Sequence, residues 1–267
     1  MKILVNERPV VVGEGTRLYE LRDTLYPGAD CIVVNGFPSP VDRTLREGDR
    51  VVFIKRGECP APEEFEALLT ARHTPGVHEK IRTATVGICG LGGLGSSVAV
   101  ALGRIGIGRL ILADFDVVEP SNLNRQCYFV DQIGMPKTEA LKATLMRLNP
   151  YLKVVTHTQR VDEASVATLF EEVDVMVEAL DRAEEKARLV EAFLTSYPTV
   201  PVVAASGLAG FGPANEIETR KVMKNLYVCG DFTSEAMEHQ GLMAPRVGVA
   251  AHHQANAVLR LLLGYRP

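Results

Sequence analysis

The sequence has 267 residues, of which 46% are hydrophobic and 23% charged, enough for the core of one large domain or two smaller ones. The formal net charge of -4 and the lack of a long basic run argue against a nucleic-acid-binding protein. Residues 1–8 are too polar for a signal peptide, and no apolar run is long enough to span a bilayer, so we expect no membrane association. The five scattered cysteines contain no C-x-x-C pair, which indicates a reduced, cytoplasmic protein without a cysteine zinc site.

Residues 1–57 are predicted to form a small α+β unit of their own. Short apolar runs separated by turn residues predict strands, and one run after Thr16, the expected N-cap, predicts a helix. The resulting order of strand, strand, helix, strand and strand is that of a β-grasp, or ubiquitin-like, fold. The expected strands are residues 2–5, 9–12, 31–34 and 50–55, and the expected helix is residues 17–25.

The segments Val33-Val34-Asn35-Gly36 and Leu45-x-x-Gly48-Asp49-x-Val51 resemble the ThiS and MoaD sulfur carriers. Those carriers end in Gly-Gly, whose carboxylate is the reacting group. In this chain the last predicted strand of the unit continues into Lys55-Arg56-Gly57-Glu58, which has neither a diglycine nor a free carboxylate. We therefore expect this unit to serve in docking, dimerisation or regulation, or to be a degenerate carrier kept for stability, and not to be the activated substrate.

Residues 58–82 are predicted to form a linker followed by a helix. Two prolines stiffen residues 59–62 and exclude helix there, and residues 63–70 are amphipathic with acidic residues near their start. From residue 83 to residue 267 strand and helix patterns alternate, which predicts a doubly wound, mostly parallel, Rossmann-like α/β sheet. The expected strands are residues 85–89, 109–113, 153–156, 173–177 and 200–204, and the expected helices are residues 96–102, 137–148, 183–194 and 247–263.

A glycine-rich turn, Gly90-Leu91-Gly92-Gly93-Leu94-Gly95, lies between the first of these strands and its helix. The first glycine permits a tight turn, the second lets phosphate approach the backbone, and the third lets helix and strand pack closely. The helix then offers free N–H groups and a positive dipole end to an anion. Gly90, Gly92, Gly93 and Gly95 are therefore candidate nucleotide-binding residues.

An acidic pair, Asp114 and Asp116, ends the next predicted strand. An acidic residue about 20 positions after the glycines typically accepts a hydrogen bond from a ribose hydroxyl. Asp114 fits this role for NAD and for ATP equally well; alternatively, it caps a turn at the strand end.

A set of cations and amides follows the acidic pair: Asn122, Arg125, Gln126 and Lys137. A dinucleotide needs no such set, whereas substitution at a triphosphate requires charge neutralisation on the reacting and leaving phosphates. This set therefore favours ATP chemistry over an NAD-dependent oxidoreductase. The other interpretation is that Arg125 and Lys137 are solvated surface charges.

Taken in sequence order, the motifs from about residue 63 to the C-terminus resemble those of the ThiF/MoeB family, the prokaryotic relatives of ubiquitin-activating enzymes. The branch that serves thiamine biosynthesis is indicated by Arg72-His73, Glu178-Ala179-x-Asp181 and Ala205-Ser206-Gly207. The family motifs are Gly90-x-Gly92-Gly93-Leu94-Gly95, Asp114-x-Asp116, Ser121-Asn122-Leu123-x-Arg125-Gln126, Gly134-x-Pro136-Lys137, Asn149-Pro150 and Gly241-Leu242-Met243-Ala244-Pro245.

The resemblance implies adenylation: the C-terminal glycine carboxylate of a ThiS-like carrier ending in Gly-Gly attacks ATP, and pyrophosphate leaves. The carboxylate is ionised at neutral pH, so positioning and charge neutralisation suffice without a general base. Other carriers, serving molybdopterin, cysteine or tRNA thiolation, remain alternatives. A further alternative is a non-catalytic, autoinhibited scaffold.

Residue roles are implied by the same resemblance. Asp181 is expected to hold Mg²⁺ against the phosphates; the other interpretation is that it caps the following helix, and both roles can coexist. Arg72 is expected to reach the nucleotide phosphates of a partner subunit, which implies a homodimer. Arg72, Arg125, Lys137 and Asp181 are thus the expected catalytic residues. Cys229 is the nearest candidate for a reactive cysteine, although a free cysteine is more often a small buried residue.

Overall fold

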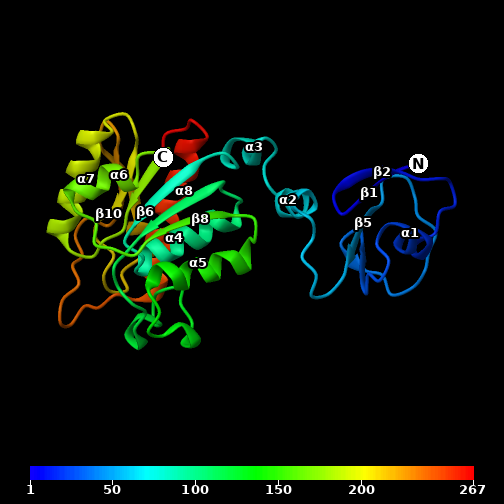
Figure 1. The fold of residues 1–267 in the computed structure, drawn as a ribbon, viewed down its shortest axis with the longest axis horizontal. Coiled ribbons are helices and arrows are strands. Elements are labelled where there is room, and N and C mark those ends of the chain that lie inside the picture. The colour runs from blue at the N-terminus through cyan, green and yellow to red at the C-terminus, as the bar shows by residue number, and fades with distance from the viewer. The chain divides into compact units, whose positions relative to one another are not determined.

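The computed structural model describes residues 1–267, and the chain divides into two compact units, Met1–His73 and Thr74–Pro267 (Figure 1). The division lies within residues 58–82, the segment predicted to be linker and helix. Each unit has its own hydrophobic core. No helix in either unit has the length and apolar character needed to cross a membrane.

The first unit contains a five-stranded sheet in the order β2-β1-β5-β3-β4. Helix α1 (Leu18–Leu25) packs on one face of this sheet, because Leu18 and Leu21 join the alternate inward residues of the strands in one core. The predicted N-cap was wrong by one residue: Arg17 is the N-cap, and the Thr16 hydroxyl donates to the Gly13 carbonyl. The strands are β1 (Lys2–Val5), β2 (Arg8–Val11), β3 (Cys31–Val34), β4 (Phe37–Pro38) and β5 (Arg50–Ile54).

After β5 the chain folds back onto its own unit. Gly57 has a positive φ of 80°, and helix α2 (Pro62–Thr70) follows a short extended segment. The Glu64 carboxylate of α2 accepts a hydrogen bond from the amide of Asn6, whose side chain also exchanges two hydrogen bonds with the backbone of Phe53. The segment that would be a free tail in a carrier is therefore continuous chain, tied to the end of the sheet.

The second unit is a three-layer α/β/α structure around a seven-stranded sheet, in the order β11-β12-β10-β9-β6-β7-β8. All strand pairs are parallel except that between β11 and β12. Helices α4, α5 and α8 cover one face and α6 and α7 the other, each face having its own core (Figure 1). The strands are β6 (Thr85–Cys89), β7 (Arg109–Ala113), β8 (Lys153–His157), β9 (Val175–Glu178), β10 (Val202–Ala205), β11 (Glu218–Met223) and β12 (Leu226–Gly230).

This architecture confirms the predicted doubly wound sheet, with four elements added. The sequence patterns missed α3, α6, β11 and β12, and they started the last helix three residues late and ended it one residue late. The α-helices are α3 (Val77–Ile81), α4 (Gly93–Arg104), α5 (Lys137–Leu148), α6 (Glu163–Leu169), α7 (Ala183–Ser196) and α8 (Ala244–Leu262), with short 3-10 helices at Pro120–Asn122, Val130–Gln132 and Ala214–Glu216.

The strand order creates a crevice at the carboxyl end of β6. From β6 the chain winds through α4 to β7 and β8, and it then crosses through α6 to β9 on the other side of β6. Loops leaving β6 and β9 therefore diverge to opposite faces of the sheet, and such a switch point is where open α/β sheets bind ligands.

Candidate functional site

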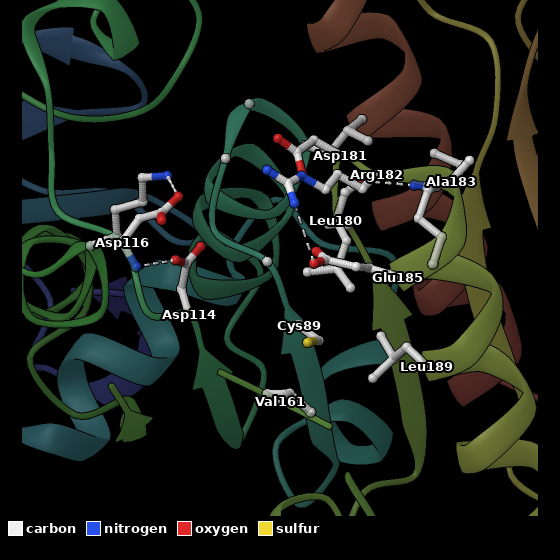
Figure 2. A pocket seen from close by; sticks show the side chains of 18 of the residues that line it. Cys89, Asp114, Asp116, Val161, Leu180, Asp181, Arg182, Ala183, Glu185 and Leu189 are labelled. Atoms are coloured by element: carbon white, nitrogen blue, oxygen red, sulfur yellow. Dashed lines mark hydrogen bonds and ion pairs between the residues drawn. The ribbon is translucent and has the colours of Figure 1, made fainter. Parts of the chain in front are cut away.

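A cavity of about 1410 Å³ occupies this crevice. Figure 2 shows Asp114 and Asp116 at the end of β7 on one side, and Asp181, Arg182 and Glu185 on the other. Its lining also includes the turn after β6, the start of α5, the end of β10 and the start of α8. The cavity therefore brings together segments that are far apart in the sequence, from Cys89 to Val247.

The glycine turn forms the floor between these two sides. Gly90 has a positive φ of 87°, and a Cβ built on it would lie 2.6 Å from the Ala179 carbonyl oxygen. A Cβ on Gly95 would lie 1.8 Å from the Gly90 carbonyl oxygen, so α4 packs directly beneath the turn. At Gly92, in contrast, the nearest atom to a Cβ is Gln126 Nε2, 3.9 Å away. Gly90 and Gly95 are thus required by packing, while Gly92 faces open space in the cavity.

Asp114 anchors this turn to the end of β7. Its carboxylate accepts hydrogen bonds from the Leu91 N–H at 2.6 Å and from the Asp116 N–H at 2.8 Å, and the residue is 9% exposed. A carboxylate has about four acceptor positions, so two remain for ribose hydroxyls. The predicted ribose role is thus compatible with a second, structural role that the sequence did not reveal.

The predicted cations and amides lie together beside Asp116. The buried Lys137 Nζ is 2.7 Å from Asp116 Oδ2, and helix α5 begins at Lys137. The Arg125 guanidinium uses only Nη1 in its hydrogen bonds, to the Ser121 carbonyl and the Asn124 amide oxygen. Its other N–H groups remain free for an anion.

Two amides support the same part of the cavity in different ways. The buried Asn122 side chain accepts a hydrogen bond from the Glu119 N–H and holds the local turn. The Gln126 Oε1 atom is buried without a hydrogen-bond partner, which is a costly arrangement in an empty site. A donor on a bound molecule would satisfy it.

Asp181 projects from the turn between β9 and α7 and lines the cavity (Figure 2). Its exposed carboxylate makes no hydrogen bond or ion pair with any residue of the chain. The alternative role as a helix cap is wrong, because Arg182 occupies the N-cap position of α7 and no side chain caps that helix. The carboxylate is therefore available to a ligand.

One end of the cavity is apolar. Cys89, Val161, Leu180, Ala183 and Leu189 surround it, as Figure 2 shows. Burial, with the nearby Glu178 and Asp114 carboxylates, raises the pKa of the Cys89 thiol far above its ordinary value, so the thiol stays neutral. This end suits a flat, uncharged group such as a nucleobase.

The polar side chains nearest this apolar end are ion-paired. The Glu185 carboxylate forms an ion pair with Arg160 and lies 3.9 Å from the Arg182 guanidinium. Both arginine side chains are more than 60% exposed. Solvent-exposed pairs of this kind contribute little to stability and open easily.

The wall beyond the glycine turn depends on a buried ion pair that the sequence patterns did not suggest. Arg246, near the start of α8, lies 2.6 Å from Asp231 and also donates to the carbonyls of Gly212 and Pro213. Burial alone raises the pKa of Asp231, but hydrogen bonds from Ser234, Thr233 and Arg246 outweigh it and hold this pKa well below its ordinary value. The pair holds together loops that are distant in sequence, so no local pattern predicts it. The one available signal was Pro245-Arg246, because a proline at this place is typical of a helix start.

Two of the candidate residues are not in the cavity. Cys229 lies within β12, is 0% exposed, and has its pKa raised to about 11 by burial, although a hydrogen bond with Thr219 opposes the shift. It is a buried structural residue, not a reactive thiol. Arg72 belongs to the first unit and is not among the lining residues. No group of three or more His, Cys, Asp or Glu side chains is arranged to hold a metal ion.

Comparison with protein families matches both units of the chain. Residues 67–267 match the ThiF family, and residues 1–57 match the ThiS-like ubiquitin family. The molybdopterin-synthase adenylyltransferase of Escherichia coli (strain K12) is 31% identical over 193 residues, which cover 70% of this chain and 76% of that protein. Ubiquitin-like modifier-activating enzyme 5 of Caenorhabditis elegans is 48% identical over 80 residues, 30% of this chain and 19% of that protein.

Solved structures show the same architecture. E. coli tRNA N6-threonylcarbamoyladenosine dehydratase, TcdA, in complex with ATP superposes with a TM-score of 0.67 over 73% of this chain and 92% of that chain, at 19% identity. This likeness concerns the fold alone. E. coli MccB in complex with MccA-N7isoASN is 27% identical, with a TM-score of 0.56 over 71% of this chain and 59% of that chain.

Proposed function

This chain belongs to the ThiF family of nucleotidyltransferases, and we propose that it transfers AMP from ATP to the C-terminal carboxylate of a ubiquitin-like sulfur carrier protein. The observation that carries the proposal is the cavity at the switch point. It combines a glycine turn, two cations, an unpaired carboxylate and an apolar end in one space. A Ser-His-Asp arrangement or a nucleophilic cysteine is not needed for this chemistry.

The proposed reaction follows from the charges in the cavity. The carrier carboxylate, already ionised, attacks the α-phosphorus of ATP; the bond from this phosphorus to the pyrophosphate oxygen breaks, and pyrophosphate and an acyl-adenylate form. Arg125, through its free guanidinium N–H groups, and Lys137 neutralise charge on the phosphates. Asp116 holds the Lys137 ammonium in place before the nucleotide arrives, which lowers the cost of organising the site.

The nucleotide itself is placed by the remaining features. The phosphates lie over Gly92 and the start of α4, the ribose hydroxyls donate to Asp114, and the base occupies the apolar end beside Val161 and Leu180. The ATP complex of TcdA, a structure of the same fold, supports this use of the architecture.

Magnesium fits this site only together with the nucleotide. Mg²⁺ is usually bound by one or two carboxylates plus phosphate oxygens, and Asp181 offers one unpaired carboxylate inside the cavity. Asp181 would hold the ion, and the ion would supply further positive charge at the phosphates. We expect no zinc.

A second substrate has room beside the nucleotide. The cavity volume exceeds that of most sites for a single small molecule. Part of the cavity wall is lined by small residues, including Gly207, Ala209 and Ala236, and an extended Gly-Gly tail without side chains suits such a wall. The carrier's terminal carboxylate could then reach the α-phosphate along it.

We further propose that the carrier is ThiS-like and serves thiamine biosynthesis, and that the active form is a homodimer in which Arg72 acts on the partner's phosphates. The match of residues 1–57 to the ThiS-like ubiquitin family supports the first statement. The names of the E. coli and Salmonella typhimurium relatives, which refer to molybdopterin synthase, favour a MoaD-type carrier instead.

ATP–pyrophosphate exchange tests the proposal. The full chain is assayed alone and with added ThiS-type or MoaD-type carriers ending in Gly-Gly, and with the same carriers shortened by one glycine. Exchange that requires the complete tail, and that is lost in Asp181→Ala, supports adenylation of a separate carrier. Exchange with the MoaD-type carrier only would refute the thiamine assignment. Nucleotide binding without exchange for any carrier would refute the enzymatic proposal and favour the scaffold.

A further inference from the structure

The turn that carries Asp181 is fixed by an ion pair between Glu178 and Lys186. Glu178, the last residue of β9, has a fully buried carboxylate, with 1% of its side chain exposed. Its Oε1 accepts the N–H of Leu180 at 2.7 Å and lies 3.0 Å from Lys186 Nζ, while its Oε2 has no partner. Lys186 lies on α7, one turn after the helix begins.

Lys186 closes the turn from the helix side. Its Nζ also donates to the Leu180 carbonyl at 2.8 Å, so one ammonium group holds a backbone carbonyl and a carboxylate at the same time. Leu180 is therefore bonded through both its N–H and its C=O to the same pair. A cation near the positive end of a helix is unfavourable by itself, and the Glu178 carboxylate compensates for it.

The strand end beneath the turn is fixed from the other face of the sheet. The Gln254 amide of α8 donates to the Glu178 carbonyl at 3.0 Å and to the Val203 carbonyl at 3.2 Å. Asp181 itself makes no hydrogen bond. Its position in the cavity thus depends wholly on the backbone of the turn, and Glu178 and Lys186 hold that backbone.

We infer that Glu178 and Lys186 are positioning residues for Asp181: their ion pair locks the β9–α7 turn so that the Asp181 carboxylate faces the nucleotide phosphates. This inference rests on the proposed function, because it takes Asp181 to act on the triphosphate. Lys186 also lines the cavity, with 20% of its side chain exposed, but its ammonium group is bonded to Glu178 and to the Leu180 carbonyl. Both act through Leu180 and the turn.

A double-mutant cycle on nucleotide binding tests this inference without needing a carrier. The dissociation constants of Mg²⁺·ATP and of AMP are measured by calorimetry for the full chain, for Lys186→Met, for Asp181→Ala and for both changes together. If Lys186 acts through Asp181, each single change weakens Mg²⁺·ATP by about tenfold and the double change weakens it no further. AMP, which lacks the β- and γ-phosphates, binds all four proteins alike.

Three further variants control for a merely structural effect of Lys186→Met. Lys186→Arg keeps the charge and is expected to retain most of the Mg²⁺·ATP affinity. Glu178→Gln/Lys186→Met removes both charges without leaving an unpaired buried carboxylate, and it replaces Lys186→Met in the cycle if the single variant fails to fold. Glu184→Gln, an exposed change on the same helix, is the matched control and is expected to bind like the parent chain.

The possible outcomes separate the positioning role of Lys186 from the role of Asp181. Equal weakening by Lys186→Met in the parent chain and in the Asp181→Ala variant would overturn the positioning role while leaving the role of Asp181 intact. Loss of AMP affinity in Lys186→Met would overturn it as well, since the whole site would then have been disturbed. An Asp181→Ala protein that binds Mg²⁺·ATP normally would instead overturn the role proposed for Asp181, and with it this inference.

Discussion

Gly95 offers a direct test of how the nucleotide turn is built. A methyl group at this position would lie 1.8 Å from the Gly90 carbonyl oxygen and 3.2 Å from Ile88 Cγ2, whereas ordinary contact begins at about 3.4 Å. The first neighbour is backbone and cannot rotate away, so α4 must move off the turn. Alanine gains about 1 kcal/mol over glycine in a helix interior, and overpacking of this severity costs at least 1–3 kcal/mol. We expect a net loss of about 2 kcal/mol.

The matched change is Gly92→Ala, whose methyl group has nothing closer than 3.9 Å. We expect it to leave stability within about 0.5 kcal/mol of the parent chain and to weaken ATP binding, because it places a methyl group where phosphate approaches the backbone. Thermal unfolding and ATP titration are measured for both variants. Gly95→Ala should lower the Tm of the second unit by about 4–8 °C. A Gly95→Ala protein with parental Tm and parental ATP affinity would refute the close packing of α4 against the turn.

The contacts in and around the cavity lead to three further predictions. Asp114→Ala removes the acceptor of two backbone N–H groups and should cost about 1.5–3 kcal/mol in urea unfolding; a loss of ATP affinity without this cost would mean that Asp114 does not anchor the turn. Lys137→Met should lower the rate of carrier-dependent ATP–pyrophosphate exchange about 100- to 1000-fold. Its free energy of unfolding should change little, because the Asp116 side chain is 47% exposed and tolerates loss of its partner. Exchange at the parental rate would exclude a role for Lys137 at the phosphates. Because the pKa of Asp231 is lowered in the folded protein, its carboxylate stabilises the fold fully at pH values above the ordinary pKa of 3.8, and this stabilisation is lost as the pH falls below that value. Asp231→Asn should therefore make the free energy of unfolding less dependent on pH below about pH 4. An unchanged pH dependence in this range would contradict the lowered pKa.

Local patterns were sufficient to predict which residues meet around the glycine turn. The glycine turn, Asp114 and the helix start at Lys137 each depend on a few neighbouring residues, and the rule that parallel strands present their carboxyl ends at one edge brings them together. The structure adds that Asp114 anchors the turn, because its two backbone partners come within reach only when the turn is folded.

The other half of the site could not be predicted in this way. Arg246 and Asp231 lie 15 residues apart in the sequence, and the local partners of Asp231, Thr233 and Ser234, give no sign that it also pairs with an arginine of α8. The sequence patterns did not predict strand β11, because it lacks an apolar run. Its residues are mostly exposed at the edge of the sheet, and half of them are charged. Glu178 stood out only through the family resemblance, and its ion pair with Lys186 was not predicted, because two residues eight positions apart come together only when the strand end meets the helix start.

The first unit shows why a carrier fold can accompany an activating fold without being its substrate. Adenylation of the kind proposed needs a free carboxylate on a tail that can extend into a cavity. Here residue 57 is joined to residue 58 by a peptide bond, the chain turns at Gly57, and α2 returns to the sheet, where Glu64 accepts a hydrogen bond from the buried Asn6. Asn6 also bonds both backbone groups of Phe53, so α2 is attached to a side chain that is itself fixed within the sheet. The unit is therefore stabilised in a form that lacks the reactive end, which agrees with the proposal that the adenylated carboxylate belongs to a separate carrier.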